Sequence, residues 1–191
     1  LGTGVDQSGR ARQPGALFVA QHLDDLRQRE GVDPVPDVQG HVETGLRGRV
    51  DLRDAAGMEN LRELVRGADI FSQGYRPGTL AKRGLSPDGL AQLRPGIVYV
   101  SLSAFGHIGP WASRRGFDTV VQTVSGITSR QGELLPGDAP GPQFYPVSAI
   151  DYLTGYLMAF GALVALAHRV RHGGSWLVRI SLAQTAHWLV G

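Results

Sequence analysis

The chain has 191 residues, of which 42% are hydrophobic, and this suits one globular domain or a large piece of a bigger one. Its net charge of +2, without arginine clusters interleaved with aromatic residues, argues against a nucleic-acid-binding protein. The absence of Cys excludes disulfides, thiolate catalysis and cysteine-ligated metal sites, and it is typical of a cytoplasmic protein.

Two features of the composition bear on the origin of the chain. It begins at Leu1 rather than at Met and stops directly after an apolar stretch, so we expect a fragment of a longer protein. Lys82 is the only lysine, and the many Arg, Ala, Gly and Pro residues predict a bacterial genome of high G+C content. The first ten residues lack the apolar core of a secretory signal.

The first quarter of the chain gives weak structural signals. Residues 1–15 predict an irregular start, and residues 16–30 have helical spacing with weak amphipathicity. The prolines of residues 31–40 predict a loop. Residues 48–54 alternate between apolar and polar side chains and therefore predict a short strand.

Clearer helix and strand signals follow. Residues 55–68 place apolar side chains on one helical face, and residues 69–75 predict a second strand. A short helix is expected at 79–83, and Ser86 followed by proline predicts the start of another helix. The β-branched run at 96–106 is typical of a strand that is buried on both faces.

The second half of the chain continues the alternation of strands and helices. A helix is expected near 117–126, a proline-rich loop after it, and a long helix over 151–170. Residues 175–183 predict another buried strand, and a last helix follows it. This order predicts an α/β fold with a largely parallel sheet.

The most apolar segment lies within the long helix. Its run from Tyr152 to Ala167 is shorter than the roughly 20 residues of an ordinary membrane span and contains Thr154, Gly155 and Gly161. We therefore expect a buried helix rather than a membrane-spanning one.

Several common catalytic patterns are missing. No pair of histidines has the spacing of a metal site, so no metal is expected. The glycine-rich stretches lack the phosphate-binding and dinucleotide-binding spacings, which disfavours an oxidoreductase. No GxSxG pattern indicates a hydrolase serine.

Asp151, at the start of the long apolar helix, has two possible interpretations. As the N-cap residue, its carboxylate would bind an amide of the first helical turn. The same position keeps a carboxylate ionised, because the helix dipole favours negative charge, and a partly hydrated carboxylate can attack an activated carbonyl. Thr154 and Gly155 would keep the first turn slim enough for a ligand to approach.

A series of motifs in order, rather than any single match, carries a resemblance to a known family. The stretches "ADIFSQGYRPGTLAKRGLSPDGL", "GIVYVSLSAFGHIGP", "DYLTGYLMAFGALVALAHR" and "GGSWLVRISLAQT" resemble the family III CoA-transferases, the CaiB/BaiF family, from about residue 46 to the end. The resemblance implies a Rossmann-like, largely parallel sheet flanked by helices, in an interlocked homodimer. It makes residues 46–191 an incomplete large domain and leaves residues 1–45 as an irregular segment with a possible helix.

The resemblance also implies roles for particular residues. Asp151 matches the aspartate that forms acyl-anhydride and CoA-thioester intermediates. Gly74, Tyr75 and Arg76 match a turn that contacts the CoA nucleotide, although Gly74 stands where the family usually has Asn. Lys82 matches a basic residue that contacts the adenosine phosphate.

The loop at 103–106 matches the family's thioester channel. Its residues are Ser103, Ala104, Phe105 and Gly106, and Ser103 stands where some transferases carry Lys. By resemblance, the activity is transfer of CoA from an acyl-CoA thioester to a carboxylic acid, with no metal or further cofactor. Two alternatives are a non-catalytic subunit or truncated remnant, and an acyl-CoA racemase. The racemase is disfavoured because Phe117 stands at the position of a proton-carrying His.

Overall fold

Four parallel strands organise the computed structural model of the chain, which describes residues 17–20, 50–134 and 141–190. The strands, in their order across the sheet, are β1 (Leu17–Ala20), β2 (Ile70–Gln73), β3 (Val98–Ser103) and β4 (Trp176–Ser181). Helices lie between β2 and β3 and between β3 and β4, which is the connection that parallel strands require. The predicted α/β fold with a parallel sheet is confirmed.

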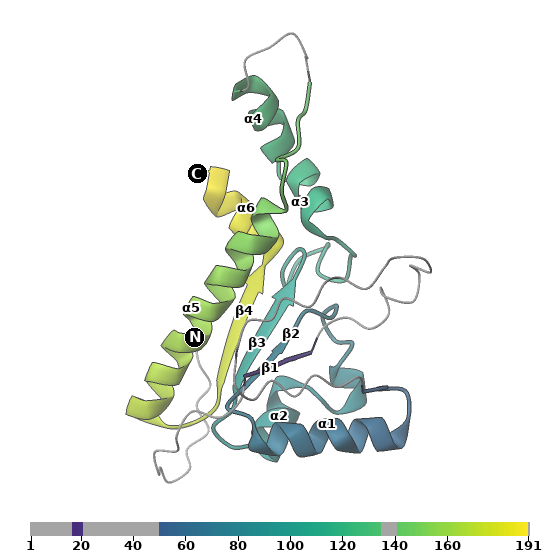
Figure 1. Cartoon of the computed structure of the whole chain (residues 1–191), viewed down its shortest axis with the longest axis vertical. Helices are drawn as coiled ribbons and strands as arrows, with labels where there is room; N and C mark the ends of the chain where they lie inside the picture. The colour runs from purple at the N-terminus through teal and green to yellow at the C-terminus, as the bar shows by residue number, and fades with distance from the viewer. Residues whose placement is uncertain (1–16, 21–49, 135–140, 191) are drawn as a thin grey trace, which may run out of the picture.

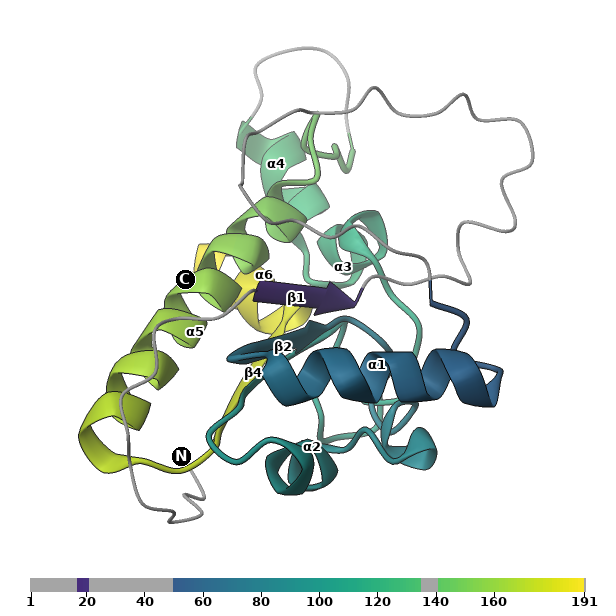
Figure 2. The same ribbon diagram turned by 60° about the horizontal axis from the view of Figure 1, so that its bottom comes forward.

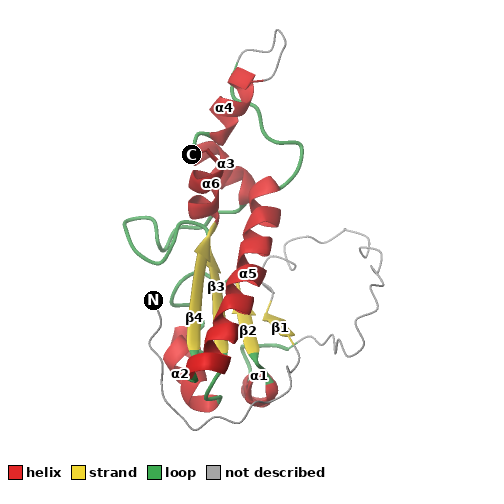
Figure 3. Ribbon diagram, turned by 90° about the vertical axis from the view of Figure 1, so that its left-hand side faces the viewer, coloured by secondary structure: helices red, strands yellow, loops and turns green. Residues whose placement is uncertain are grey.

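Helices flank this sheet on both sides, as Figures 1 and 3 show. Seven helical segments lie within the described residues: α1 (Ala55–Gly67), the 3₁₀ turn η2 (Ala81–Arg83), α2 (Pro87–Leu93), α3 (Asp118–Val124), α4 (Ile127–Leu134), α5 (Ala149–His172) and α6 (Leu182–Val190). In Figure 2, α1 lies in front of the strands, α2 lies below them, and α5 runs down their left-hand side.

The aromatic core lies on the face of the sheet that packs against α1 and α2. Phe71 of β2 and Tyr99 of β3 are register partners, and their ring centroids lie 5.2 Å apart. Leu61 and Val65 of α1 and Leu90 of α2 are buried in the same cluster. Helical spacing on α1 and strand alternation on β2 and β3 together produce this core.

The opposite face of the sheet packs against α5 through small side chains. Val98 and Val100 of β3 are buried with Ala162 and Ala165 of α5. A Cβ at Gly161 would lie 2.7 Å from a methyl group of Val178, so the missing side chain lets the helix approach β4 closely. The helix is therefore held against the sheet over its middle turns.

Much of α5 nevertheless faces outward, which contradicts the prediction of a buried helix. A set that we call the α5 stripe repeats along its outer side, and each member is at least 65% exposed: Tyr152, Tyr156, Phe160 and Leu163. With 24 residues, α5 is also longer than the apolar run suggested, and by length and composition it could cross a membrane. Its packing on β3 and β4 accounts for it as a helix of the α/β fold.

Two expectations for the first quarter of the chain are wrong where the structure describes it. Residues Leu17–Ala20 form strand β1 beside β2, whereas helical spacing was expected there; the rest of 16–30 lies outside the described residues. Residues 50–54 form turns instead of a strand, because Asp51 pairs with Arg53 and Asp54 caps α1 through the Gly57 amide. Sequence alternation alone did not reveal these local polar contacts.

Most later elements lie where the sequence predicted them. Ser86 caps α2 as expected, because its Oγ accepts a hydrogen bond of 3.0 Å from the Gly89 amide. Helix α4 was not predicted; Gly126 separates it from α3 with a φ of +83°, a conformation suited to glycine. Strand β4 is less buried than expected, since Ser181 is its only buried residue.

Candidate functional site

Helices α3, α4, α5 and α6 meet beyond the carboxyl ends of β3 and β4, in the upper part of Figure 1. Their contact is an apolar cluster whose buried members are Val121, Ile127, Ile150, Leu182 and Ala186. The carboxyl ends of strands are where open α/β sheets place ligands. The cluster therefore fixes the start of α5, and with it Asp151, at the edge of the sheet where chemistry is expected.

Asp118, in the first turn of α3, is the buried polar centre of this region, with 3% of its surface exposed. One carboxylate oxygen accepts hydrogen bonds from the backbone amides of Ile150 at 2.9 Å and Asp151 at 3.0 Å. The other accepts from the side-chain amide of Gln122, whose own oxygen accepts from the Tyr145 amide at 3.1 Å. Asp118 thus joins α3 to the first turn of α5.

Asp151 is not the N-cap residue, which corrects the first interpretation of this aspartate. The N-cap is Ser148, so Asp151 is the third residue of α5. The Asp151 side chain is exposed and makes no hydrogen bond or ion pair to the residues that the structure describes. Partial burial of its carboxyl group raises the pKa of Asp151, and the neighbouring Asp118 carboxylate raises it further.

The two small residues after Asp151 have different surroundings. Thr154 is buried, and its hydroxyl donates a hydrogen bond of 2.9 Å to Thr185, which ties α5 to α6. Gly155 is exposed, and a Cβ built on it would meet nothing within 4 Å. Thr154 is thus a packing residue, whereas open space beside Gly155 leaves this side of the helix accessible.

The loop after β3 lies beside the start of α5. Ala104 and Phe105 pack against the apolar cluster that contains Ile150, and Ser103 Oγ accepts a hydrogen bond of 3.1 Å from the Gly106 amide. This bond closes a tight turn in which Gly106 has a φ of +91°. The structure therefore brings the predicted 103–106 loop to the same region as Asp151.

The predicted nucleotide-contacting residues lie on the other face of the sheet. Gly74 and Arg76 are exposed in the loop after β2, and Lys82 is exposed in η2. Tyr75 differs, because only 8% of its surface is exposed and its ring belongs to the aromatic core. Its role in binding CoA stays a prediction, and its observed contacts are those of a core residue.

A pocket of about 130 Å³ opens beside Arg76. Arg76, His107 and Arg179 bring basic groups to it, and buried Gln73 and Ser101 form its polar floor. Gln73 donates 2.7 Å to Ser101 Oγ, which lies 3.0 Å from His107 Nε2. No carboxylate appears among its described lining residues, so the pocket favours an anion.

The basic groups of this pocket also affect one another. Partial burial lowers the pKa of His107, and the positive charge of Arg179 lowers it further. Tyr99, at the pocket wall, donates a hydrogen bond of 3.2 Å to the Leu85 carbonyl, and burial raises the pKa of its phenol to about 12. At neutral pH the fixed positive charge of the pocket therefore comes from Arg76 and Arg179.

Sequence reasoning missed Asp118, Gln122 and Arg179 as members of these sites. A signal for Asp118 was present in the stretch Gly116-Phe117-Asp118, since aspartate is favoured in the first turn of a helix. No local pattern could show that its oxygen reaches amides more than thirty residues later. Arg179 reads as an alternating strand residue, and only the sheet register places it beside Ser101.

A Rossmann-like sheet with an exposed aspartate at a helix start is the arrangement that the resemblance led us to expect. The family model of CoA-transferase family III matches residues 46–191. The chain therefore belongs to CoA-transferase family III.

Individual relatives agree with this assignment. A probable fatty acyl-CoA transferase of Mycobacterium tuberculosis is 34% identical over 137 residues, which are 72% of this chain and 34% of that protein. The succinyl-CoA–D-citramalate CoA-transferase of Chloroflexus aurantiacus is 35% identical over 133 residues, 70% of this chain and 32% of the relative. A CaiB/BaiF family protein from Brucella suis has a similar crystal structure, with a TM-score of 0.68 and 30% identity over 74% of this chain and 36% of that one. The chain thus spans about a third of the length of these relatives.

Proposed function

We propose that this chain carries the nucleophile and part of the CoA site of an acyl-CoA:carboxylate CoA-transferase. The observation that carries the proposal is the exposed Asp151 carboxylate, which has no hydrogen-bonding partner among the described residues. A raised pKa makes a carboxylate more basic, and its nucleophilicity rises with its basicity, while it stays ionised at neutral pH. The Asp151 carboxylate is exposed, so a thioester can reach it, and it lies beside the apolar cluster that contains Ile150.

The reaction would proceed through covalent intermediates on Asp151. A carboxylate oxygen attacks the thioester carbonyl and expels CoA thiolate, which leaves a mixed anhydride. The thiolate then attacks the aspartyl carbon, releasing the donor acid and forming an aspartyl-CoA thioester. The acceptor carboxylate attacks this thioester and expels the thiolate again, and the thiolate takes the acceptor acyl group and frees Asp151. Each step exchanges one acyl bond for another, so thioester energy is conserved.

The anionic part of CoA would bind in the pocket beside Arg76. Its phosphates need positive charge, which Arg76 and Arg179 supply, and hydrogen-bond donors of the kind that line the pocket. Lys82 lies exposed in η2, whose neighbour Ala81 lines the pocket, so it can add charge at the rim. The thioester end of CoA would then reach around the strand ends toward Asp151.

The direct test is Asp151→Asn in the intact protein. We expect loss of CoA transfer by at least about 10³-fold, the scale seen when a nucleophile is removed. In the unmodified protein, acyl-CoA should leave a CoA thioester on Asp151 that mass spectrometry of peptides locates. Glu63→Gln, on the exposed surface of α1, is the matched control and should stay active. Full activity of Asp151→Asn would refute the proposal.

The main alternative is a non-catalytic subunit or truncated remnant of such a transferase. Calorimetry with CoA and analytical ultracentrifugation separate the two. We expect CoA binding and a homodimer for the transferase, with the α5 stripe as a surface available to a second copy. A monomer without CoA affinity would favour the remnant. A cytoplasmic location stays a prediction.

A further inference from the structure

The first turn of α5 can be capped in two ways that have opposite consequences for Asp151. Ser148 and Asp151 have the spacing of a capping box, in which the N-cap hydroxyl accepts from the third amide and the third side chain returns to the N-cap amide. That arrangement would tie the Asp151 carboxylate to its own helix. A nucleophile bound in this way could not approach a thioester.

The structure adopts the other arrangement. Ser148 makes no side-chain cap, and the Asp151 amide that its hydroxyl would receive donates instead to Asp118. Asp118 also accepts from the Ile150 amide, so it satisfies two of the free amides at the start of α5. The Asp151 carboxylate is left without a capping role.

Asp118 is itself held in place by its surroundings, so it can fix the position of Asp151. It is almost completely buried, and Gln122 donates to its second oxygen while accepting from the Tyr145 amide. Ile150, next to Asp151, is fully buried in the apolar cluster. The position of the Asp151 backbone therefore follows from its own amide bond to Asp118 and from the burial of Ile150 beside it.

We propose that Asp118 is a positioning residue for Asp151, which replaces the local cap of α5 and thereby keeps the Asp151 carboxylate free and aimed away from its own helix. This inference rests on the proposed function of Asp151 as the nucleophile. In this arrangement the buried Asp118 carboxylate on α3 caps the first turn of α5. A capping box of Ser148 and Asp151 would cap the same turn, but it would bind the carboxylate that catalysis needs free.

The charge of Asp118 adds a second effect. The charged group that acts on Asp151 from α3 is Asp118, and α6, also packed against α5, has His187 as its only titratable side chain. Removing the Asp118 charge should lower the pKa of Asp151, because a like charge disfavours ionisation. Closing the capping box should lower it further, because amide donors stabilise the carboxylate.

The test compares three variants of the intact protein. Asp118→Ala removes both the acceptor and the charge. Asp118→Asn keeps an oxygen for the two amides but turns an NH₂ group toward that of Gln122. Adding Gln122→Glu to it restores donor–acceptor pairing, because the new carboxylate accepts from the NH₂ group introduced at position 118 and from the Tyr145 amide. The double variant therefore preserves the network and moves only the charge.

Two readouts are independent of each other. The pKa of Asp151, followed by NMR of its carboxyl carbon, should fall most in Asp118→Ala and less in the double variant. The kcat should fall about 10²-fold in Asp118→Ala, the scale of misplacing a reacting group, with KM for acyl-CoA nearly unchanged. The double variant should recover most of that kcat.

Contrary outcomes are equally specific. An unchanged Asp151 pKa in folded Asp118→Ala, or a loss of thermal stability with kcat retained, would show that Asp118 only supports the fold. If Asp118→Ala does not fold, a double variant whose kcat has fallen as far as that of Asp151→Asn would overturn the inference. The pKa of Asp151 tests the role of Asp118 without any enzymatic turnover. Whether Asp151 is the nucleophile is tested separately, because full activity of Asp151→Asn would refute that role.

Discussion

Asp151 carries a stability cost in the folded chain, because burial and Asp118 both raise its pKa. A raised pKa means that the folded state prefers the protonated form. The stability linked to this group is complete below its unfolded pKa, about 3.9, and is lost as pH rises through the folded value. At neutral pH the ionised Asp151 side chain therefore lowers the stability of the folded state, and the proposed nucleophilic attack needs this ionised form.

Asp151→Asn should therefore stabilise the protein at pH 7 while it abolishes transfer. Since the group is partly exposed, we expect a gain of about 0.2–1 kcal/mol in the free energy of unfolding, the range of exposed charge interactions. The gain should vanish below about pH 3.5, where protonation of Asp151 prevails in both states. Urea unfolding at the two pH values measures this. Asp88→Asn, at the exposed start of α2, should give no gain, and equal effects of Asp151→Asn at both pH values would contradict the prediction.

The residues of the site illustrate what a single sequence could predict. Asp151 was found as the exceptional residue because it is a lone charge at the start of an apolar run. Of its two interpretations, the N-cap role is wrong, since a capping pattern is local and the acceptor of the Asp151 amide, Asp118, lies on another helix. Pairwise contacts between distant elements depend on how α3 and α5 pack, and no periodicity encodes that packing.

At the scale of elements, α5 combines two glycines with different surroundings. Gly161 faces β4 so closely that a Cβ would lie 2.7 Å from Val178, whereas a Cβ at Gly155 would have open space. The same substitution should therefore have opposite effects at these two positions of one helix. This difference follows from packing against the sheet and not from helix propensity, which is equal at both positions.

Gly161→Ala should destabilise the protein by about 1–3 kcal/mol, the usual cost of overpacking. Gly155→Ala should stabilise it by up to about 1 kcal/mol, because alanine is the better helix former. Chemical unfolding of both variants, with circular dichroism as the signal, measures the difference. Stabilisation by Gly161→Ala would show that α5 is not held against β4 as closely as the structure indicates.

The helices also show where sequence patterns stop being informative. The spacing of α1 predicted its bounds to within one residue and placed Leu61 and Val65 on its buried face, although Leu64 is exposed. Helix α5 is apolar nearly all round, so its sequence predicted a helix but not which side is covered. The α5 stripe could be recognised only after Ala162 and Ala165 were placed against β3.

For the molecule as a whole, one buried ion cluster joins both helical layers across the sheet. Asp69, just before β2, has a side chain only 5% exposed and lies 3.0 Å from Arg169 of α5 and 3.4 Å from Arg94, which ends α2. Arg169 also donates 2.9 Å to the Gly96 carbonyl. The cluster therefore fixes the end of the molecule opposite to Asp151 and sets the direction in which α5 runs.

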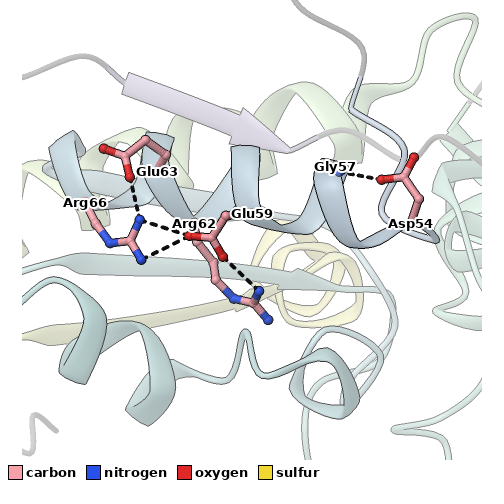
Figure 4. A network of polar contacts seen from close by, with 6 residues as sticks. All are labelled: Asp54, Gly57, Glu59, Arg62, Glu63 and Arg66. Atoms are coloured by element: carbon pink, nitrogen blue, oxygen red, sulfur yellow. Dashed lines mark hydrogen bonds and ion pairs between the residues drawn. The ribbon is translucent and has the colours of Figure 1, made fainter.

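Breaking this cluster should cost far more than breaking surface ion pairs. Asp69→Asn leaves two mostly buried guanidinium groups without their carboxylate, and we expect a loss of about 3–5 kcal/mol in the free energy of unfolding. The matched control is Glu59→Gln on α1, whose exposed pairs with Arg62 and Arg66 are drawn in Figure 4. It should hardly change the urea midpoint, because exposed pairs are screened by water and salt.

The comparison of the two variants tests how the layers are joined. If the cluster ties α5 to the rest of the sheet, hydrogen exchange in Asp69→Asn should rise first at the carboxyl end of α5, around Arg169, and later near Asp151, which the Asp118 contacts hold separately. Equal destabilisation by Asp69→Asn and Glu59→Gln would mean that the cluster is as hydrated as the surface network. In that case the apolar contacts of Ala162 and Ala165 would hold the carboxyl-terminal half of α5, and the approach of Gly161 to Val178 would set its orientation there.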